Sequence, residues 1–362
     1  YVLTKLNKKV ALIDRREISS GETGRTTAHI TYELDPGYSE LIRVFGRETS
    51  KLIMESHKEA IDFIEQIIKT ENIKCDFERV DGYLFPYEKN TKEELNKEFN
   101  ALRSLGNAEV ALKESNELIN KPSLLIPKQA QFHPIKFINA LLTLIEKNGG
   151  NIFTNTTAKK ITENTVETES YTISAEDIII ATNTPVHTRF VIHSKQSPYR
   201  TYVIAAKVPK KKHELYWSLG KTDSGVGNPY YYIRYHPLNL KQDIIIIGGE
   251  DQKTGQETYD SFYSLERFAK KIGVKKIDYK WSGQVFEPSD YCAFIGKTPG
   301  EKSYLVTGIS GNGMTYAAIA SMIIPDLILK KENKYSKIYD PDRKPIKALK
   351  ELLTNQISVK QF

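Results

Sequence analysis

Apolar residues along this chain follow two patterns. In the first, short continuous apolar runs such as 10–13 and 178–180 alternate with polar turns and with segments of helical periodicity. A continuous run of this kind is typical of a strand buried on both faces of a parallel sheet. In the second, strand-like segments follow one another from Pro198 to Gly249, which predicts an antiparallel sheet. The fold class expected is therefore α/β, of the mixed α+β kind, with an antiparallel second part.

The first half of the chain predicts mainly helices joined by short strands. Apolar residues recur at helical spacing over 36–69, with Gly46 as an interruption, and Asp81-Gly82 is a strong hairpin dipeptide. In chain order the elements expected are the end of a helix at 1–7, a strand at 10–14, two helices within 36–69, a strand pair over 77–86, a helix at 90–106, a strand at 122–127 and a helix at 133–148.

The second half predicts mainly strands. The elements expected are a strand within 151–161, a hairpin over 165–174, a buried parallel strand at 177–182, antiparallel strands at 201–208, 214–219, 230–236 and 243–249, a helix at 258–272, a strand at 275–286, a strand at 304–307 and a helix up to Leu329. The tail from 330 to 362 is charged and is expected to be weakly structured. We find no internal repeat.

Composition narrows the functional class. The 362 residues carry 52 basic and 45 acidic side chains, a net charge of +7, and the lysines are spread along the chain, which argues against a nucleic-acid partner. Two cysteines without metal-binding spacing, and no signal peptide, predict a cytoplasmic protein. The most apolar stretch, 304–329, is broken by glycines and by Pro325 and Asp326, so no transmembrane segment is expected.

The segment Lys9–His29, KVALIDRREISSGETGRTTAH, carries a candidate nucleotide site. A buried strand ending in a carboxylate, Asp14, is the arrangement that binds an adenosine ribose, although such an Asp can also serve as a turn residue or a helix cap. The Thr and Arg side chains that follow could face a pyrophosphate or a flavin, or could form an ordinary polar loop. A glycine-rich turn is expected about 20 residues before such a carboxylate. Asp14 stands too near the start of the sequence for such a turn. We therefore expect the first strand and the glycine-rich turn of this nucleotide-binding unit to be missing.

Two further segments carry candidate chemistry. Gly308–Thr315 is a glycine loop that opens a helix, where backbone N–H groups can stabilise an anion such as a reduced flavin, or where the chain simply turns. In the segment 230–235, YYYIRY, alternation places Tyr230, Tyr232 and Arg234 on one face of a strand. Arg234 and Tyr232 could form a substrate wall with Arg234 holding an anionic group, or the face could be a cross-strand aromatic ladder.

The order of these pieces resembles the D-amino-acid oxidase and glycine oxidase family of FAD-dependent oxidoreductases. The resemblance rests on Lys9–His29, on Thr156–Ile161, on DIIIATNTP at 177–185 and on YLVTGISGNGMTYAAIASMI at 304–323. The segments YYYIRY and IIIIGGEDQKTGQ resemble a branch with glycine/D-amino-acid and γ-glutamylputrescine oxidoreductases. Some longer members of that branch continue into a C-terminal Rieske domain, for which the two cysteines here do not suffice.

The resemblance implies a Rossmann-like FAD-binding domain built from 1–80, 130–190 and 290–335, a substrate domain with an antiparallel sheet from 81–129 and 191–289, and a tail from 336 to 362. It implies non-covalently bound FAD. The residues that it places against the cofactor are Asp14, Arg15, Thr23, Arg25, Thr26, Thr27, His29, Ala158, Ala181, Thr182, Gly308, Gly311, Asn312, Gly313, Met314 and Thr315.

The function implied is oxidation of the C–N bond of an amino acid or amine by hydride transfer to flavin N5, with O2 or a quinone-like acceptor reoxidising the flavin. In glycine oxidases an arginine follows a Trp-x-Gly and clamps the substrate carboxylate, but here Trp281-Ser282-Gly283 is followed by Gln284. An amine or a larger amino compound is therefore a further candidate. The alternatives are a cofactor-free remnant that acts as a binding or structural protein, and a plain NAD-binding dehydrogenase.

Overall fold

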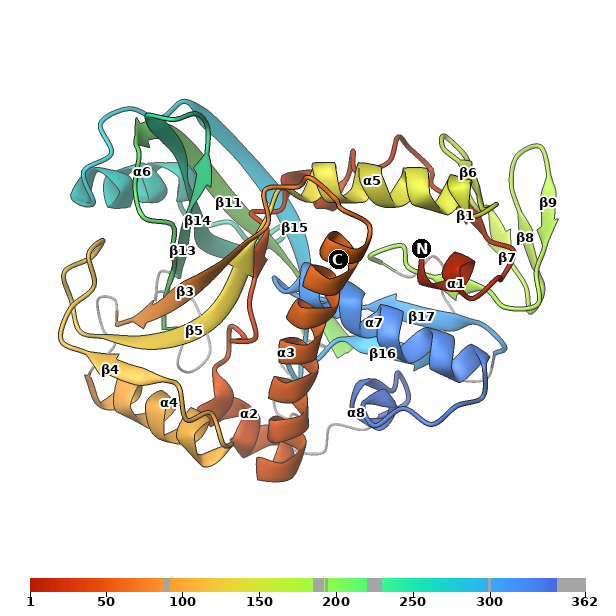
Figure 1. Ribbon diagram of the computed structural model, residues 1–362, viewed down its shortest axis with the longest axis horizontal. Coiled ribbons are helices and arrows are strands. Elements are labelled where there is room, and N and C mark those ends of the chain that lie inside the picture. The colour runs from red at the N-terminus through yellow and green to blue at the C-terminus, as the bar shows by residue number, and fades with distance from the viewer. Residues whose placement is uncertain (87–91, 185–191, 193–194, 220–229, 299–300, 344–362) are drawn as a thin grey trace.

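The structure, a computed structural model, describes residues 1–86, 92–184, 192, 195–219, 230–298 and 301–343. The described residues form one large mixed sheet and several small sheets (Figure 1). The large sheet lies on one side of the molecule and the small parallel sheets lie on the other, with α3 (Arg47–Thr70) and α7 (Gly313–Ile328) between them.

The large sheet has nine strands within the described residues, in the order β15-β11-β14-β13-β12-β3-β5-β2, with β4 also paired to β5. Their bounds are β2 His29–Ile30, β3 Glu78–Phe85, β4 Ala111–Lys113, β5 Ser123–Gln131, β11 Gln196–Pro209, β12 Leu215–Ser218, β13 Tyr231–Pro237, β14 Gln242–Lys253 and β15 Tyr279–Pro288. All described pairs are antiparallel except β12 with β3.

The two faces of the large sheet cover different cores. On the outer face, Ile233, Tyr235 and Ile247 pack against α6 (Ser261–Lys271). On the inner face, Leu215 and Trp217 belong to a larger core with α3, α7, α2 (Tyr38–Phe45), α4 (Lys92–Ser104) and α8 (Ser336–Tyr339). The inner face is therefore the one turned toward the parallel strands.

The small sheets carry the candidate nucleotide site. β1 (Ala11–Ile13) pairs in parallel with β6 (Asn151–Phe153), and β10 (Ile179–Ile180) pairs in parallel with β17 (Tyr304–Thr307), which β16 (Phe294–Lys297) flanks in antiparallel. β7 (Lys160–Ile161), β8 (Thr165–Glu167) and β9 (Thr172–Ser174) form a meander. α1 (Val2–Lys5) and α5 (Pro134–Lys147) accompany the parallel pair β1–β6 (Figure 1).

Several expected elements are confirmed closely. Two helices meet at Gly46, whose φ of 80° suits a residue without a side chain. The antiparallel strands, the helix after His133-Pro134, the hairpin over 165–174 and the strand at 304–307 also lie where the pattern predicts them.

The hairpin predicted at Asp81-Gly82 is wrong, because β3 continues through both residues. The pairing with β5 shifts register between Val80 and Gly82, so the glycine marks a bulge instead of a turn. The indole of Trp217 lies against Gly82, and a Cβ at this position would lie 2.3 Å from Trp217 Cη2. Gly82 is thus required for close packing of a ring on the strand.

Three other expectations need correction. The strand expected within 151–161 is two short strands, because residues 154–159 form a loop between β6 and β7. The strand expected at 177–182 shrinks to Ile179–Ile180, and Ile179 is 38% exposed because β10 pairs, within the described residues, only with β17. The strand at 122–127 runs on through Pro127 to Gln131, and β16 was not expected.

The tail was expected to be weakly structured, and this is wrong up to residue 343, while 344–362 lie outside the described residues. Tyr339 in α8 is fully buried, and its hydroxyl lies 2.6 Å from Ser56 Oγ in α3. Arg343 forms two 2.8 Å hydrogen bonds with the fully buried carboxylate of Asp290 and also donates to the carbonyls of Cys292 and Ala293.

No described helix combines the length and the apolar character that crossing a bilayer requires.

The buried pair of Arg343 and Asp290 gives a stability prediction. Arg343→Gln leaves the Asp290 carboxylate buried without its counter-charge, so we expect the free energy of unfolding to fall by about 3–5 kcal/mol. Urea denaturation followed by circular dichroism measures the change. Lys302→Gln is the matched control, since its pair with Glu163 is 70% and 62% exposed and is screened by solvent, so its loss should be small. An equal, small effect of both variants would contradict the assignment.

Candidate functional site

The loop after β1 is held against the large sheet by β15. It forms a short 3-10 helix, η1 (Glu22–Arg25). Trp281 Nε1 donates to the Arg25 carbonyl over 2.8 Å, and the Gln284 amide donates to Glu22 Oε2 over 2.8 Å. Trp281 and Gln284 of β15 therefore hold the loop after β1 in place. The Arg25 guanidinium in turn donates from Nη1 to the Ser282 carbonyl over 3.4 Å.

The next residues turn the chain into β2. Ala28 has a φ of 55°, and Thr26 Oγ1 accepts the Ala28 amide over 3.1 Å. His29 Nδ1 lies 3.1 Å from Thr27 Oγ1, and Nε2 lies 3.3 Å from the Ile233 carbonyl. Burial lowers the pKa of His29 to about 3, with a further contribution from Arg234. A neutral ring with its proton on Nε2 satisfies both contacts, since it donates to Ile233 and accepts from Thr27.

The other residues predicted to contact the nucleotide lie in η1 and in the segments that follow β1, β6 and β10. Asp14 directly follows β1, and its Oδ1 accepts the Arg16 amide over 2.9 Å, so one carboxylate oxygen caps the turn. Arg15 and Ala181 are exposed, and Thr23 lies in η1. Ala158 packs with Ile13 against the small core that contains Ile180. Thr182 Oγ1 donates to the Thr184 carbonyl over 2.7 Å.

The glycine loop follows β17. Gly308 has a φ of 63°, and a Cβ there would lie 2.9 Å from Pro288 Cγ, so only glycine fits without strain. Gly311 is exposed, and apart from its chain neighbours the carboxylate of Asp35 is the only described group within 4 Å of the position of its missing Cβ. Asn312 caps α7 without a side-chain hydrogen bond, and Gly313 and Met314 begin the helix. The first N–H groups of α7 are thus left for another acceptor.

Thr315 and His57 fasten this loop to α3. Thr315 Oγ1 donates to the Asn312 carbonyl over 3.1 Å and lies 2.9 Å from His57 Nδ1. His57 is fully buried, and burial lowers its pKa to about 3. A neutral His57 that donates from Nδ1 satisfies the hydroxyl oxygen of Thr315. Sequence reasoning missed His57, because one histidine within a helical apolar stretch gives no sign of its partner.

The alternation predicted for 230–235 is confirmed, with Tyr231, Ile233 and Tyr235 in the outer core and Tyr230, Tyr232 and Arg234 on the inner face. The Tyr232 ring crosses β14 at Gly248, where a Cβ would lie 2.1 Å from the ring. Its hydroxyl then reaches Thr201 Oγ1 on β11, 2.6 Å away. Gly248 is therefore what allows the ring to lie flat on the sheet.

Arg234 is deeper than the aromatic residues. Arg234 is only 3% exposed. Its Nη1 lies 3.4 Å from Gln131 Oε1, and its Nη2 lies 3.4 Å from the Phe132 carbonyl oxygen. Nε has no hydrogen-bond partner, and no described carboxylate lies within ion-pair distance. Burial lowers the pKa of Arg234 to about 10. Long contacts and an unpartnered donor leave this cation able to accept an anionic group.

Asp35 was not singled out from the sequence. It precedes Pro36 at the start of a helical segment, where an Asp is usually a cap. Its Oδ1 accepts the Tyr230 hydroxyl over 2.8 Å, and its Oδ2 faces Gly311. Asp35 thus lies between Tyr230 on the inner face of the sheet and the glycine loop.

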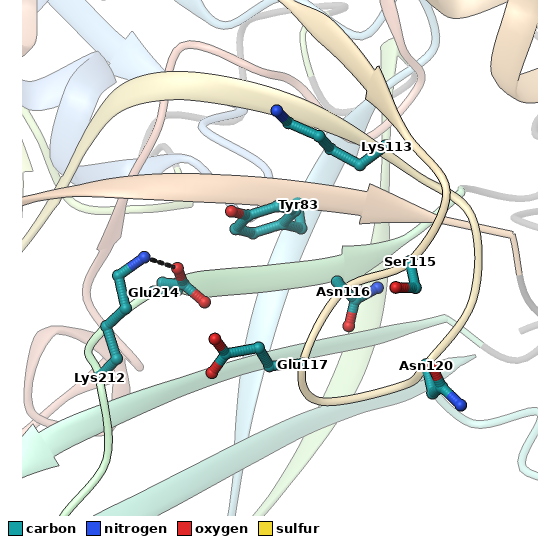
Figure 2. A pocket seen from close by; sticks show the side chains of 8 residues that line it. All are labelled: Tyr83, Lys113, Ser115, Asn116, Glu117, Asn120, Lys212 and Glu214. Carbon is teal, nitrogen blue, oxygen red and sulfur yellow. Dashed lines mark hydrogen bonds and ion pairs between the residues drawn. The ribbon is translucent and has the colours of Figure 1, made fainter.

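A separate hollow of about 350 Å³ opens on the outer side (Figure 2). Its lining consists of Tyr83, Lys113, Ser115, Asn116, Glu117, Asn120, Lys212 and Glu214, none of which the sequence singled out. Tyr83 stacks on Tyr216 with ring centroids 5.5 Å apart, and Tyr216 belongs to the outer core. This hollow is therefore on the face of the sheet opposite to Tyr232.

The described residues fit the flavin expected from the resemblance. The N-terminus of α7 has no side-chain cap, Gly311 is exposed beside it, and one oxygen of Asp14 is free of its turn contact. An open helix terminus suits the electron-rich pyrimidine end of a flavin, and the second oxygen of Asp14 suits a ribose hydroxyl.

The flat packing of Tyr232 gives a second prediction. Gly248→Ala forces the ring off β14 and off Thr201, so we expect unfolding to become easier by about 1–3 kcal/mol, with a changed near-ultraviolet dichroism spectrum. Gly21→Ala serves as the control, because nothing lies within 4 Å of its added Cβ. Thermal denaturation of both variants measures the difference. A Gly248→Ala protein as stable as Gly21→Ala would contradict the packing.

His57 gives a prediction on pH. Its pKa is about 3 when folded and about 6.5 when unfolded, so below about pH 6.5 the unfolded chain binds the extra proton. Wild type therefore loses about 1.4 kcal/mol per pH unit from this group as pH falls through 6 to 4. His57→Leu removes that contribution. We expect urea titrations at pH 7.5, 6 and 5 to show a shallower loss for the variant, whereas parallel curves would refute a buried neutral His57.

Comparison with known proteins agrees with this geometry. The model of the FAD dependent oxidoreductase family (DAO) matches residues 1–327. The putative Rieske 2Fe-2S iron-sulfur protein YhfW of Bacillus subtilis (strain 168) is 33% identical over 356 residues, which cover 95% of this chain and 68% of that protein. Gamma-glutamylputrescine oxidoreductase of Escherichia coli (strain K12) is 21% identical over 335 residues, with 88% and 78% covered.

Solved structures share the fold. Glycine oxidase from Geobacillus kaustophilus superposes with a TM-score of 0.74 at 16% identity, over 95% of this chain and 94% of that one. L-proline dehydrogenase from P. horikoshii gives 0.72 at 18% identity, over 94% and 92%. The match of the family model over most of the length, together with the 33% identical relative, shows that the chain belongs to the FAD dependent oxidoreductase family, whose members are flavoenzymes.

Proposed function

We propose that this flavoprotein-family chain oxidises the C–N bond of a small amine or amino acid. The observation that carries the proposal is the contact between the glycine loop and the aromatic inner face of the sheet. Asp35 faces Gly311 with one oxygen and accepts the Tyr230 hydroxyl with the other. A substrate held on Tyr230 and Tyr232 would therefore lie next to the loop expected to hold the flavin.

When bound, FAD supplies an acceptor for two electrons, taken up as a hydride. The residues of this chain would hold and orient the reactants. The open N-terminus of α7 would stabilise negative charge at the cofactor. Asp14 would bind the ribose, and Thr23, Arg25, Thr26, Thr27 and His29 would line the pyrophosphate and flavin side. The expected electron acceptor is O2 or a quinone-like molecule.

We assign Tyr232 to the substrate wall and Arg234 to an anionic group of a substrate. The Thr201 contact and the neutral His29 ring, whose centroid lies 5.6 Å from that of Tyr232, fix the tyrosine ring. A rigid aromatic surface favours a defined approach of the substrate C–H bond, which is the main contribution that positioning makes to such a reaction. The unpartnered Nε of Arg234 suits a carboxylate at the far end of a longer substrate.

The proposal predicts a yellow protein. Purified protein incubated with FAD and freed of excess cofactor should absorb at about 450 nm, and an amine or amino acid that is a substrate should bleach this band without oxygen. Gly311→Val fills the space beside the terminus of α7 and should weaken FAD binding at least about tenfold. Ala317→Val, on the exposed side of the same helix, is the control. A protein that stays colourless with FAD would overturn the proposal for this chain.

A further inference from the structure

The turn between β13 and β14 carries two leucines that the fold does not use. Leu240 is 97% exposed, Leu238 is 42% exposed, and neither belongs to a described hydrophobic cluster. Asn239 closes the turn, because its Oδ1 accepts the amides of Lys241 and Gln242 over 2.9 Å each. Turns of this kind favour Asn, Asp, Gly and Ser, and they need no apolar side chain. The two leucines therefore protrude from a hydrogen-bonded tip without stabilising it.

Lysines accompany the leucines at this end of the large sheet. The chain that leaves β11 passes beside the turn, since the Lys210 amide donates to the Lys241 carbonyl over 3.0 Å. Lys207, Lys211 and Lys241 are exposed, and in the part of the chain that the structure describes none of the three has a carboxylate within ion-pair distance. The lysine–leucine tip is the set of Lys207, Lys211, Leu238, Leu240 and Lys241.

The carboxylates that pair with the neighbouring lysines are buried. Asp243 is fully buried, and it accepts Lys210 Nζ over 2.9 Å and the Lys211 amide over 2.8 Å. Glu214 is 3% exposed and pairs with Lys212. These two carboxylates balance Lys210 and Lys212 and leave the three lysines of the tip unbalanced. The tip thus presents positive charge around an apolar apex.

An anionic lipid bilayer matches both the charge and the apex. A leucine side chain gains free energy when it leaves water for the hydrocarbon boundary, and lysines are attracted by the negative surface potential of anionic lipids. A nucleic acid would attract the lysines through its phosphates but would leave the leucines without a role. A specific protein interface buries about 1,200–2,000 Å² in total, of which the apex of one hairpin supplies a small part.

We propose that the lysine–leucine tip docks this protein on the surface of an anionic phospholipid bilayer, with Leu238 and Leu240 at the head-group boundary and the lysines among the lipid phosphates. Tyr230 directly precedes β13 and the tip follows its end, so the bilayer contacts the end of the sheet opposite to Tyr230. The inference goes beyond the proposed function and does not depend on bound FAD.

Co-sedimentation of the purified chain with lipid vesicles tests the docking. We expect binding at low salt to vesicles of phosphatidylglycerol and phosphatidylcholine, and no binding to vesicles of phosphatidylcholine alone. Salt at about 1 M, where the Debye length is about 3 Å, should release the protein, because the attraction of the lysines is then screened.

Two double variants test the two features of the tip separately. Leu238→Ser with Leu240→Ser should lower the partition coefficient at least about tenfold, because the apolar contact is lost. Lys211→Gln with Lys241→Gln should lower it about tenfold or more, because two attracted charges are lost. Thermal melting checks that both variants are folded.

Matched control variants lie on the other side of the molecule (Figure 1). Tyr171→Ser removes a side chain that is 76% exposed from the turn before β9. Lys8→Gln with Lys9→Gln removes the same two charges from the exposed segment before β1. Neither control should change vesicle binding by more than about twofold, because surface charges far from the bilayer are screened.

A fluorescent label reports directly on contact with lipid. The two native cysteines, Cys75 and Cys292, are buried, so Leu240→Cys offers an accessible thiol for an environment-sensitive dye. Anionic vesicles should shift the emission of this label to the blue, as expected for a dye that leaves water. The same dye on Tyr171→Cys should show no shift.

Three outcomes would overturn the inference. The first is a wild-type chain that does not sediment with anionic vesicles at low salt. The second is a leucine double variant that binds vesicles as tightly as Tyr171→Ser. The third is a duplex oligonucleotide that binds through Lys211 and Lys241 while vesicles do not.

Discussion

The arrangement of this site depends on the attachment of the segment 22–35 to the inner face of the large sheet. Trp281 binds the Arg25 carbonyl, His29 contacts the Ile233 carbonyl, and Tyr230 binds Asp35. These contacts join residues about 200 or more positions apart, so the loop expected at the cofactor has its shape only when the sheet has formed. Two of the three bonds are accepted by backbone carbonyls. They therefore hold the backbone itself in position as well as the side chains.

The sequence was informative wherever the controlling physics is local. Alternation in 230–235 placed Tyr232 and Arg234 on one face, since side chains of a strand alternate whatever lies above them. Gly46 and the glycine loop at 308–313 were recognised because positive φ angles and helix starts leave local signatures. The order of these segments along the chain was enough to indicate the family.

What the sequence could not show depends on partners distant in the chain. Asp81-Gly82 reads as a turn until Trp217 from another strand is seen lying on the glycine. Asp35 looks like a helix cap, and His57 like one more residue of a helix, until Tyr230 and Thr315 are placed beside them. The ordered part of the tail was missed for the same reason, because the partner of Arg343 is the buried Asp290, which is 53 positions earlier.

The ring of Tyr232 fills the volume that any side chain at position 248 would need. Substitutions at positions 232 and 248 are therefore coupled, although 15 residues separate the two positions. A side chain at position 248 requires either a smaller residue at position 232 or a Tyr232 ring displaced from β14 and from Thr201. This part of the inner face therefore changes most easily in paired steps, which restricts the side chains that relatives of this chain can place there.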